Sequence, residues 1–163
     1  MSIRASAIDP VQHEQLTLQL LKSWTTPNAF THNAWANANH TLLVTTDETN
    51  PGGTMAVYDI SNLGLPGPPP LLSQVGPLPP SLVHNAYFED DDGERVAMSH
   101  YGLGAKLVDL HRPSRPVELG SYDTQPDSDT GFVGAWGMYN FDSRGYLYVS
   151  DIQRGLFILS YTP

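Results

Sequence analysis

The chain has 163 residues, of which 40% are hydrophobic and 15% charged, and its formal net charge is -9 at pH 7. This acidity, without any stripe of basic residues, argues against nucleic acid and against anionic membrane surfaces as partners. Because the chain contains no cysteine, disulfides, thiolate metal sites and cysteine nucleophiles are excluded. No apolar run approaches the roughly 18 residues that a membrane span requires, so membrane insertion is not expected.

The N-terminal region is predicted to contain a tail followed by one strand. Residues 1–15 form a tail without the apolar stretch of a signal peptide, which leaves the localisation open. Residues 16–24 are predicted to form a strand, because Leu21-Lys22-Ser23-Trp24 is similar to Leu119-Gly120-Ser121-Tyr122 at the end of a later strand. We therefore expect one structural unit over residues 16–163.

One sequence pattern then occurs three times, at a spacing of roughly 50 residues, which is the period of a four-stranded propeller blade. The first segments that align are His32-Asn33-Ala34-Trp35, His84-Asn85-Ala86-Tyr87 and Ala135-Trp136-Gly137-Met138. The second are Val44-Thr45-Thr46, Met98-Ser99-His100 and Val149-Ser150-Asp151. The third are Val57-Tyr58-Asp59-Ile60, Leu107-Val108-Asp109-Leu110 and Ile158-Leu159-Ser160-Tyr161.

Each copy is predicted to begin with a strand at its first segment. Second strands are expected at 41–46, 95–100 and 146–151, third strands at 55–60, 105–110 and 156–161, and fourth strands at 71–75 and 117–122. Gly, Asn and Asp lie between them, as tight hairpin turns require. The sequence therefore predicts an all-β chain of four-stranded antiparallel blades of the β-propeller type, three per chain.

The third copy lacks a fourth strand, and we expect residues 16–24 to supply it, in a partner chain. Propellers generally close with about four to eight blades, so three blades leave two apolar end faces uncovered. Two copies related by a two-fold axis would cover both faces. The sequence thus predicts a homodimer that completes a six-bladed ring.

Polar and aromatic residues that recur at matching positions are the candidate site. The first strands carry His32, Asn33, His84, Asn85 and Trp136, and the second strands carry Asp47, Glu48, His100 and Asp151. Imidazole and carboxylate groups facing one axis could hold a ligand or a divalent metal such as Zn²⁺, with His32, His84 and His100 as candidate metal ligands. The alternative is structural, because His and Asn at repeat positions often tie strand ends together through the backbone.

Three functional hypotheses follow from these residues. The first is a non-enzymatic binding or interaction propeller that presents its polar channel mouth and loops to a protein, glycan or small ligand. The second is a metal-dependent hydrolase or lyase that uses the channel His and Asp residues. The third is a half-propeller fragment without independent activity. The serine-hydrolase elbow, the phosphate loop and the dinucleotide fingerprint are all absent from the sequence.

In addition, the chain resembles the choice-of-anchor B family, whose propellers carry LVIVD-like repeats. The segments that carry this resemblance include Thr45-Thr46-Asp47-Glu48, Val57-Tyr58-Asp59-Ile60-Ser61, Gly120-Ser121-Tyr122-Asp123-Thr124 and Ser150-Asp151-Ile152-Gln153-Arg154-Gly155-Leu156. The resemblance implies a secreted or surface-attached β-propeller of uncharacterised function. Members of that family are longer, with an export signal and a C-terminal anchor that we do not find in this sequence.

Overall fold

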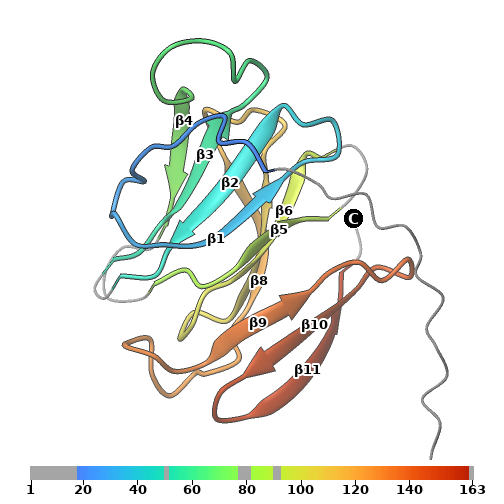
Figure 1. Cartoon of the computed structure of the whole chain (residues 1–163). Coiled ribbons are helices and arrows are strands. Elements are labelled where there is room, and N and C mark those ends of the chain that lie inside the picture. The colour runs from blue at the N-terminus through green and yellow to red at the C-terminus, as the bar shows by residue number, and fades with distance from the viewer. Residues whose placement is uncertain (1–17, 50–51, 77–81, 90–92, 162–163) are drawn as a thin grey trace, which may run out of the picture.

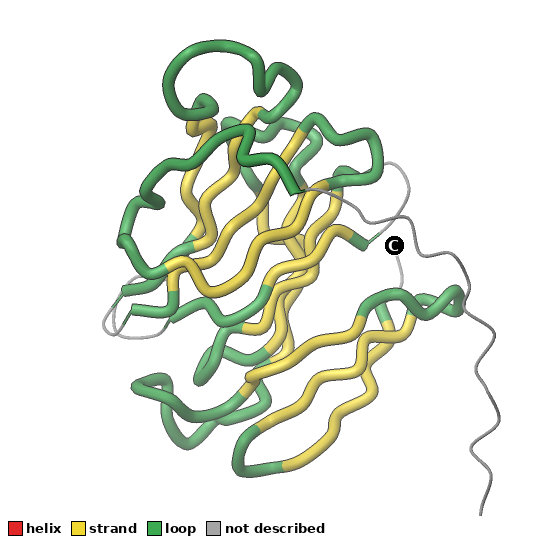
Figure 2. Tube along the Cα trace, viewed as in Figure 1, coloured by secondary structure: helices red, strands yellow, loops and turns green. Residues whose placement is uncertain are grey.

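The computed structural model describes residues 18–49, 52–76, 82–89 and 93–161, and in this part of the chain it contains strands and loops but no helix (Figures 1 and 2). Its strands are β1 (Thr31–Ala36), β2 (Leu42–Asp47), β3 (Met55–Asp59), β4 (Leu71–Val75), β5 (Ala86–Phe88), β6 (Arg95–Ser99), β7 (Ala105–Asp109), β8 (Val117–Tyr122), β9 (Ala135–Tyr139), β10 (Tyr146–Asp151) and β11 (Gly155–Ser160). No helix in the described residues could span a membrane.

The strands form three antiparallel sheets in chain order, which we call blades 1, 2 and 3 (Figure 1). Blade 1 has the strand order β1-β2-β3-β4, blade 2 the order β5-β6-β7-β8, and blade 3 consists of β9, β10 and β11. The all-β fold class and its blade-like sheets are confirmed, and β2 to β11 lie within about two residues of the strands expected from the sequence.

Two apolar cores join the blades, because alternate residues of a strand face opposite sides of its sheet. Val96 of β6 packs with Val44 and Val57 of blade 1 in the first core. The next residue, Ala97, packs with Leu147 and Val149 of blade 3 in the second core. The central blade is therefore apolar on both faces, and both faces are covered.

The strand pairing also fixes which residues of the three copies are equivalent. The ladder between the second and third strands aligns Thr46 with Ser99 and Ser150, since these residues pair with Met55, Ala105 and Leu156. The ladder between the first and second strands then aligns Ala34 with Ala86 and Met138.

This corrects the sequence alignment by one residue in two places. Trp136, rather than Ala135, is equivalent to His32 and His84. In the second strands, Thr46, rather than Thr45, is equivalent to Ser99. The physical reason is the alternation of side chains along a strand. In the structural register the aromatic residues Trp35, Tyr87 and Tyr139 are equivalent and lie on the same side of their sheets. The sequence alignment had instead matched Met138 to Trp35 and Tyr87.

Buried hydroxyl groups on the second strands hydrogen-bond across the blade boundaries. Thr46 donates from Oγ1 to the carbonyl of His84 at 2.5 Å, and Ser99 donates from Oγ to the carbonyl of Trp136 at 2.9 Å. The Ser99 hydroxyl also accepts the N–H of Asn85 at 3.1 Å. These bonds set the height of each first strand relative to the preceding blade.

The N-terminal segment runs over blade 1. Thr26 donates from Oγ1 to a carboxylate oxygen of Asp47 at 2.5 Å, and the ring of Trp24 packs edge-on against Tyr58 at 5.5 Å. Residues 18–24 form no strand in the single chain, and residues 1–17 lie outside the described residues. Whether residues 16–24 complete a blade of a partner chain stays a prediction.

We predict that Ser99→Ala lowers the free energy of unfolding by about 1 kcal/mol, because it leaves the partly buried N–H of Asn85 and carbonyl of Trp136 without their shared partner. Urea unfolding followed by tryptophan fluorescence measures the change. Ser143→Ala, in an exposed turn, is the control and should have little effect. Equal stability of the two variants would contradict a structural role for the Ser99 hydroxyl.

Candidate functional site

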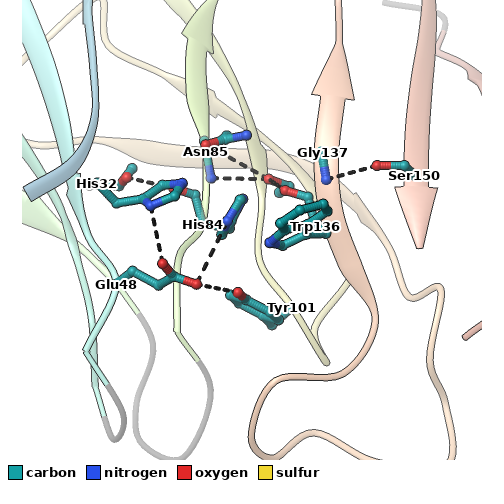
Figure 3. A network of polar contacts seen from close by, with 10 residues as sticks. His32, Glu48, His84, Asn85, Tyr101, Trp136, Gly137 and Ser150 are labelled. Atoms are coloured by element: carbon teal, nitrogen blue, oxygen red, sulfur yellow. Dashed lines mark hydrogen bonds and ion pairs between the residues drawn. The ribbon is translucent and has the colours of Figure 1, made fainter. Parts of the chain in front are cut away.

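Three rings from the first strands of the blades lie in a row (Figure 3). His32 belongs to β1, His84 lies two residues before β5, and Trp136 belongs to β9. The ring centroids of His32 and His84 are 4.1 Å apart, and those of His84 and Trp136 are 5.2 Å apart. The row follows from the strand register, because these three residues are equivalent members of the repeat.

A carboxylate joins the two histidines. Glu48, which directly follows β2, places Oε2 at 3.1 Å from Nδ1 of His32 and Oε1 at 3.7 Å from Nε2 of His84. The hydroxyl of Tyr101 donates a hydrogen bond to Oε1 of Glu48 (Figure 3). The side chains of these four residues thus converge from the ends of two blades.

A tight turn holds Tyr101 in this position. Its backbone has φ +35°, in the left-handed region that a bulky residue rarely occupies. Its carbonyl accepts the N–H of Gly104 at 2.9 Å and that of Ala135 at 3.0 Å. Gly134 passes so close that a Cβ there would lie 2.4 Å from this carbonyl oxygen, which only glycine avoids. The backbone strain at Tyr101 is therefore held by both blade 2 and the entry into blade 3.

Burial shifts the pKa values of two members of this cluster, His84 and Tyr101. Burial, with a smaller contribution from the neighbouring His32, lowers the pKa of His84, so its imidazole is held neutral. Burial and the hydrogen bond to Glu48 raise the pKa of Tyr101 well above its ordinary value, so its hydroxyl stays protonated and donates. Neutral imidazole is the form that binds metals.

Three residues of the cluster are close enough together to hold a metal ion. Ligand atoms of His32, Glu48 and His84 all lie within 4.8 Å of one another. Two ligands of a tetrahedral zinc ion, each about 2.0–2.1 Å from the metal, lie roughly 3.3 Å apart. The separations of 3.1 and 3.7 Å around Glu48 bracket that value. Two imidazoles and a carboxylate are also a donor set that zinc sites use.

The other sequence candidates serve different contacts in the structure. The carboxylate of Asp47 accepts the Thr26 hydroxyl and, at 2.7 Å, the N–H of Asn28, so it holds the N-terminal segment. Asp151 accepts the N–H groups of the two residues that follow Ile152, at 2.9 and 2.8 Å, and so shapes the turn after β10. Neither belongs to the group of three ligands found among the described residues.

The two asparagines tie the first strands to their surroundings. Asn33 accepts the N–H of Ala86 through its side-chain oxygen at 3.2 Å, which links blades 1 and 2. Asn85 donates its backbone N–H to Ser99. The contact of Asn33 therefore supports the structural alternative, in which asparagines at repeat positions tie strand ends together through the backbone.

His100 lies apart from the three-ligand group, although the sequence suggested it as a metal ligand. It is 2% exposed, and burial, followed by the charge of Lys106, lowers its pKa to about 4 against the opposing charge of Glu118. It occupies the repeat position of Asp47 and follows directly after the β6 residue Ser99.

Tyr101 was missed in the sequence because the alignment was offset by one residue. In the structural register Tyr101 is the equivalent of Glu48, since each lies two positions after the aligned hydroxyl residue. The tyrosine and the glutamate of neighbouring blades therefore meet at the same level. Correct alignment of the second strands is the signal that would have identified it.

No family model and no curated protein matches this chain. Seventeen chains of solved structures resemble it. One is a protein from Lactobacillus plantarum of known crystal structure, with a TM-score of 0.61 and 14% sequence identity over 85% of this chain and 40% of that chain.

An identity this low shows the fold alone, and that fold is propeller-like. Together with the three consecutive antiparallel blades, it defines the chain as an all-β protein of propeller-like architecture. The chain spans less than half the length of this structural neighbour.

Burial of neutral His100 predicts acid sensitivity. The unfolded chain takes up a proton on this histidine near pH 6.5, whereas the folded state resists it until about pH 4. The neutral ring therefore makes its full contribution to the free energy of unfolding above pH 6.5. This contribution, up to about 3 kcal/mol, is lost as the pH falls from 6.5 towards 4. Urea unfolding at pH 7.5 and pH 4.5 should show this loss, and His100→Gln should reduce it. The same loss in the variant would contradict the assignment to His100.

Proposed function

We propose that this protein is a binding propeller whose cluster of His32, Glu48 and His84 binds a divalent metal of the zinc type. The observation that carries the proposal is the convergence of three ligand atoms, from the ends of separate strands, within 4.8 Å. The partly exposed side chain of His32 supports it, because a bound ion there could exchange its remaining ligand with solvent or with a recruited molecule.

The surroundings of the cluster add support. The hydroxyl of Tyr101 orients the carboxylate of Glu48, as outer hydrogen-bond donors orient metal ligands. The Trp136 ring beside His84 offers an aromatic surface next to the ion. A ligand with an oxygen or nitrogen donor and a flat apolar part would fit this combination.

Membership of the choice-of-anchor B family remains a proposal that rests on the sequence motifs.

The proposal predicts one bound Zn²⁺ per chain in native mass spectrometry and isothermal titration calorimetry. His84→Ala should weaken binding by about 100-fold or more, since loss of even an outer-shell partner costs about 10–100-fold. His111→Ala is the matched control, because its Nδ1 pairs with Glu94 at 3.0 Å on the surface, outside the cluster. Equal zinc affinity in wild type, His84→Ala and His111→Ala would exclude the site.

Tyr101→Phe should weaken zinc binding by about tenfold, because it keeps the ring but removes the hydroxyl that orients Glu48. Isothermal titration calorimetry measures this effect, after circular dichroism has shown that the variant is folded. An unchanged affinity would mean that the tyrosine holds the loop without tuning the metal ligand.

A metal-dependent hydrolase or lyase is the second candidate. The observation that favours it is the set of three protein ligands, which leaves a coordination position for water, as in catalytic zinc sites. Zinc-loaded protein should then hydrolyse p-nitrophenyl acetate faster than chelator-treated protein, and His84→Ala should abolish the difference. A hydrolysis rate of the zinc-loaded protein equal to the background rate would exclude a hydrolase, and it would not contradict the binding proposal.

A further inference from the structure

We propose that the open face and strand edge of blade 3 bind a second copy of this chain. The second copy inserts its residues 18–24 as the fourth strand of blade 3, and the two chains together form a closed ring of six blades. Four features of the described residues support this arrangement: a hydroxyl group, an aromatic contact, an apolar outer face and a strand edge next to a repeated bulge.

The first feature is the series of hydroxyl groups at blade boundaries. Thr46 bonds to the carbonyl of His84 in blade 2, and Ser99 bonds to the carbonyl of Trp136 in blade 3. Ser150 is the next member, and its Oγ accepts the N–H of Gly137 at 3.0 Å, just as Ser99 accepts that of Asn85 at 3.1 Å. By analogy with Thr46 and Ser99, we expect its hydroxyl to donate to a fourth blade, where the equivalent acceptor is the carbonyl of His32 of the partner subunit.

The second feature is the contact of the N-terminal segment with blade 1. At the end of β8, the ring of Tyr122 packs against Phe157 in the third strand of the next blade at 6.0 Å. Trp24 packs against Tyr58 in the third strand of blade 1 at 5.5 Å, two residues beyond Ala56, the equivalent of Phe157. Trp24 thus contacts the side of blade 1 that a preceding blade would face, since Tyr58 points away from the core shared with blade 2.

The third feature is the apolar character of the outer face of blade 3. Leu156 and Ile158 of β11 are 66% and 60% exposed. Their equivalents in blade 2, Ala105 and Leu107, are buried against blade 3 in the second core. A neighbouring blade at this face would cover β11 in the same way and remove the apolar patch from water.

The fourth feature is the edge of β11, which is hydrogen-bonded to β10 and to no other described strand. Blades 1 and 2 both carry a bulge in the ladder between their third and fourth strands, at Val57/Tyr58 and at Leu107/Val108. The same register in blade 3 places Ser23 of the partner subunit opposite Phe157 and Leu20 of the partner subunit opposite Leu159.

In this register two leucines that are exposed in the single chain would become buried. Leu18 and Leu20 are 97% and 79% exposed in the single chain. As alternate residues of one strand they would share the face directed at blade 2. A groove of about 460 Å³ lies there, beside β11, and its lining includes Leu159 and Tyr161. The leucines would fill it, and the new ladder would remove an unpaired strand edge.

The register can be tested by a disulfide, because the chain contains no cysteine of its own. The double variant Ser23→Cys, Phe157→Cys should form covalent dimers under mild oxidation, whereas each single variant should remain uncrosslinked. Non-reducing electrophoresis separates the outcomes. A double variant that forms only intramolecular links, or none, would overturn the strand exchange.

Size-exclusion chromatography with light scattering tests the assembly. We expect a particle of twice the chain mass of 17.9 kDa. Ile158→Arg should raise the dimer dissociation constant at least about tenfold, since it places a charge in an apolar interface. Val117→Arg is the matched control, because Val117 is 55% exposed on the outermost strand of blade 2, which no blade covers in the ring.

Two further variants test the exchanged strand and the contact between blades separately. The first is a deletion of residues 1–24, and the second is Ser150→Ala. The deletion should weaken the dimer by removing the exchanged strand, and Ser150→Ala should weaken it at the blade boundary. Circular dichroism confirms that each variant is folded. A wild-type chain that stays at 17.9 kDa over the accessible concentration range overturns the ring, and a dimer unaffected by the deletion overturns the exchange alone.

Discussion

The structure depends on a constraint set by the pleat of the second strands. Successive residues of a strand face opposite sides, and in β6 both sides are apolar. A sheet of this kind is stable only between two other sheets, because each uncovered face would leave a large apolar area in water. The composition of β6 therefore requires a blade on each side of blade 2, and the two cores between the blades meet this requirement.

The candidate site is a consequence of the same stacking. Apolar contacts alone would allow neighbouring blades to slide, whereas the bonds of Thr46 and Ser99 to backbone carbonyls fix their relative height. With that height fixed, equivalent residues of the first strands meet ring to ring, and Glu48 of one blade reaches His84 of the next. Hydrogen bonds that are structural in origin thus help to bring together His32, Glu48 and His84, the group that could hold a metal ion.

Much of the fold could be predicted from the sequence because its signals are local. The short apolar runs within 95–99 and 105–109, and the Gly and Asp turns between strands, depend on neighbours along the chain. The pairing of His32 with His84 also followed from the repeat, since equivalent positions of adjacent blades must lie side by side. The role of Trp136 was harder to predict, because the third copy has Trp136-Gly137 in place of the His-Asn pair and the sequence alignment matched Ala135 to the histidines instead.

By itself, the sequence determined the strand class, the turns, the number of blades and the shared level of the two histidines. Only the tertiary structure decided which acidic groups join them. Glu48 meets both imidazoles and Tyr101, while Asp47 and Asp151 are engaged by the backbone of the N-terminal segment and of a turn. The reason is that periodicity specifies which face a side chain occupies. The distance between side chains of different blades is set by the hydroxyl bonds between the blades and by the left-handed turn at Tyr101.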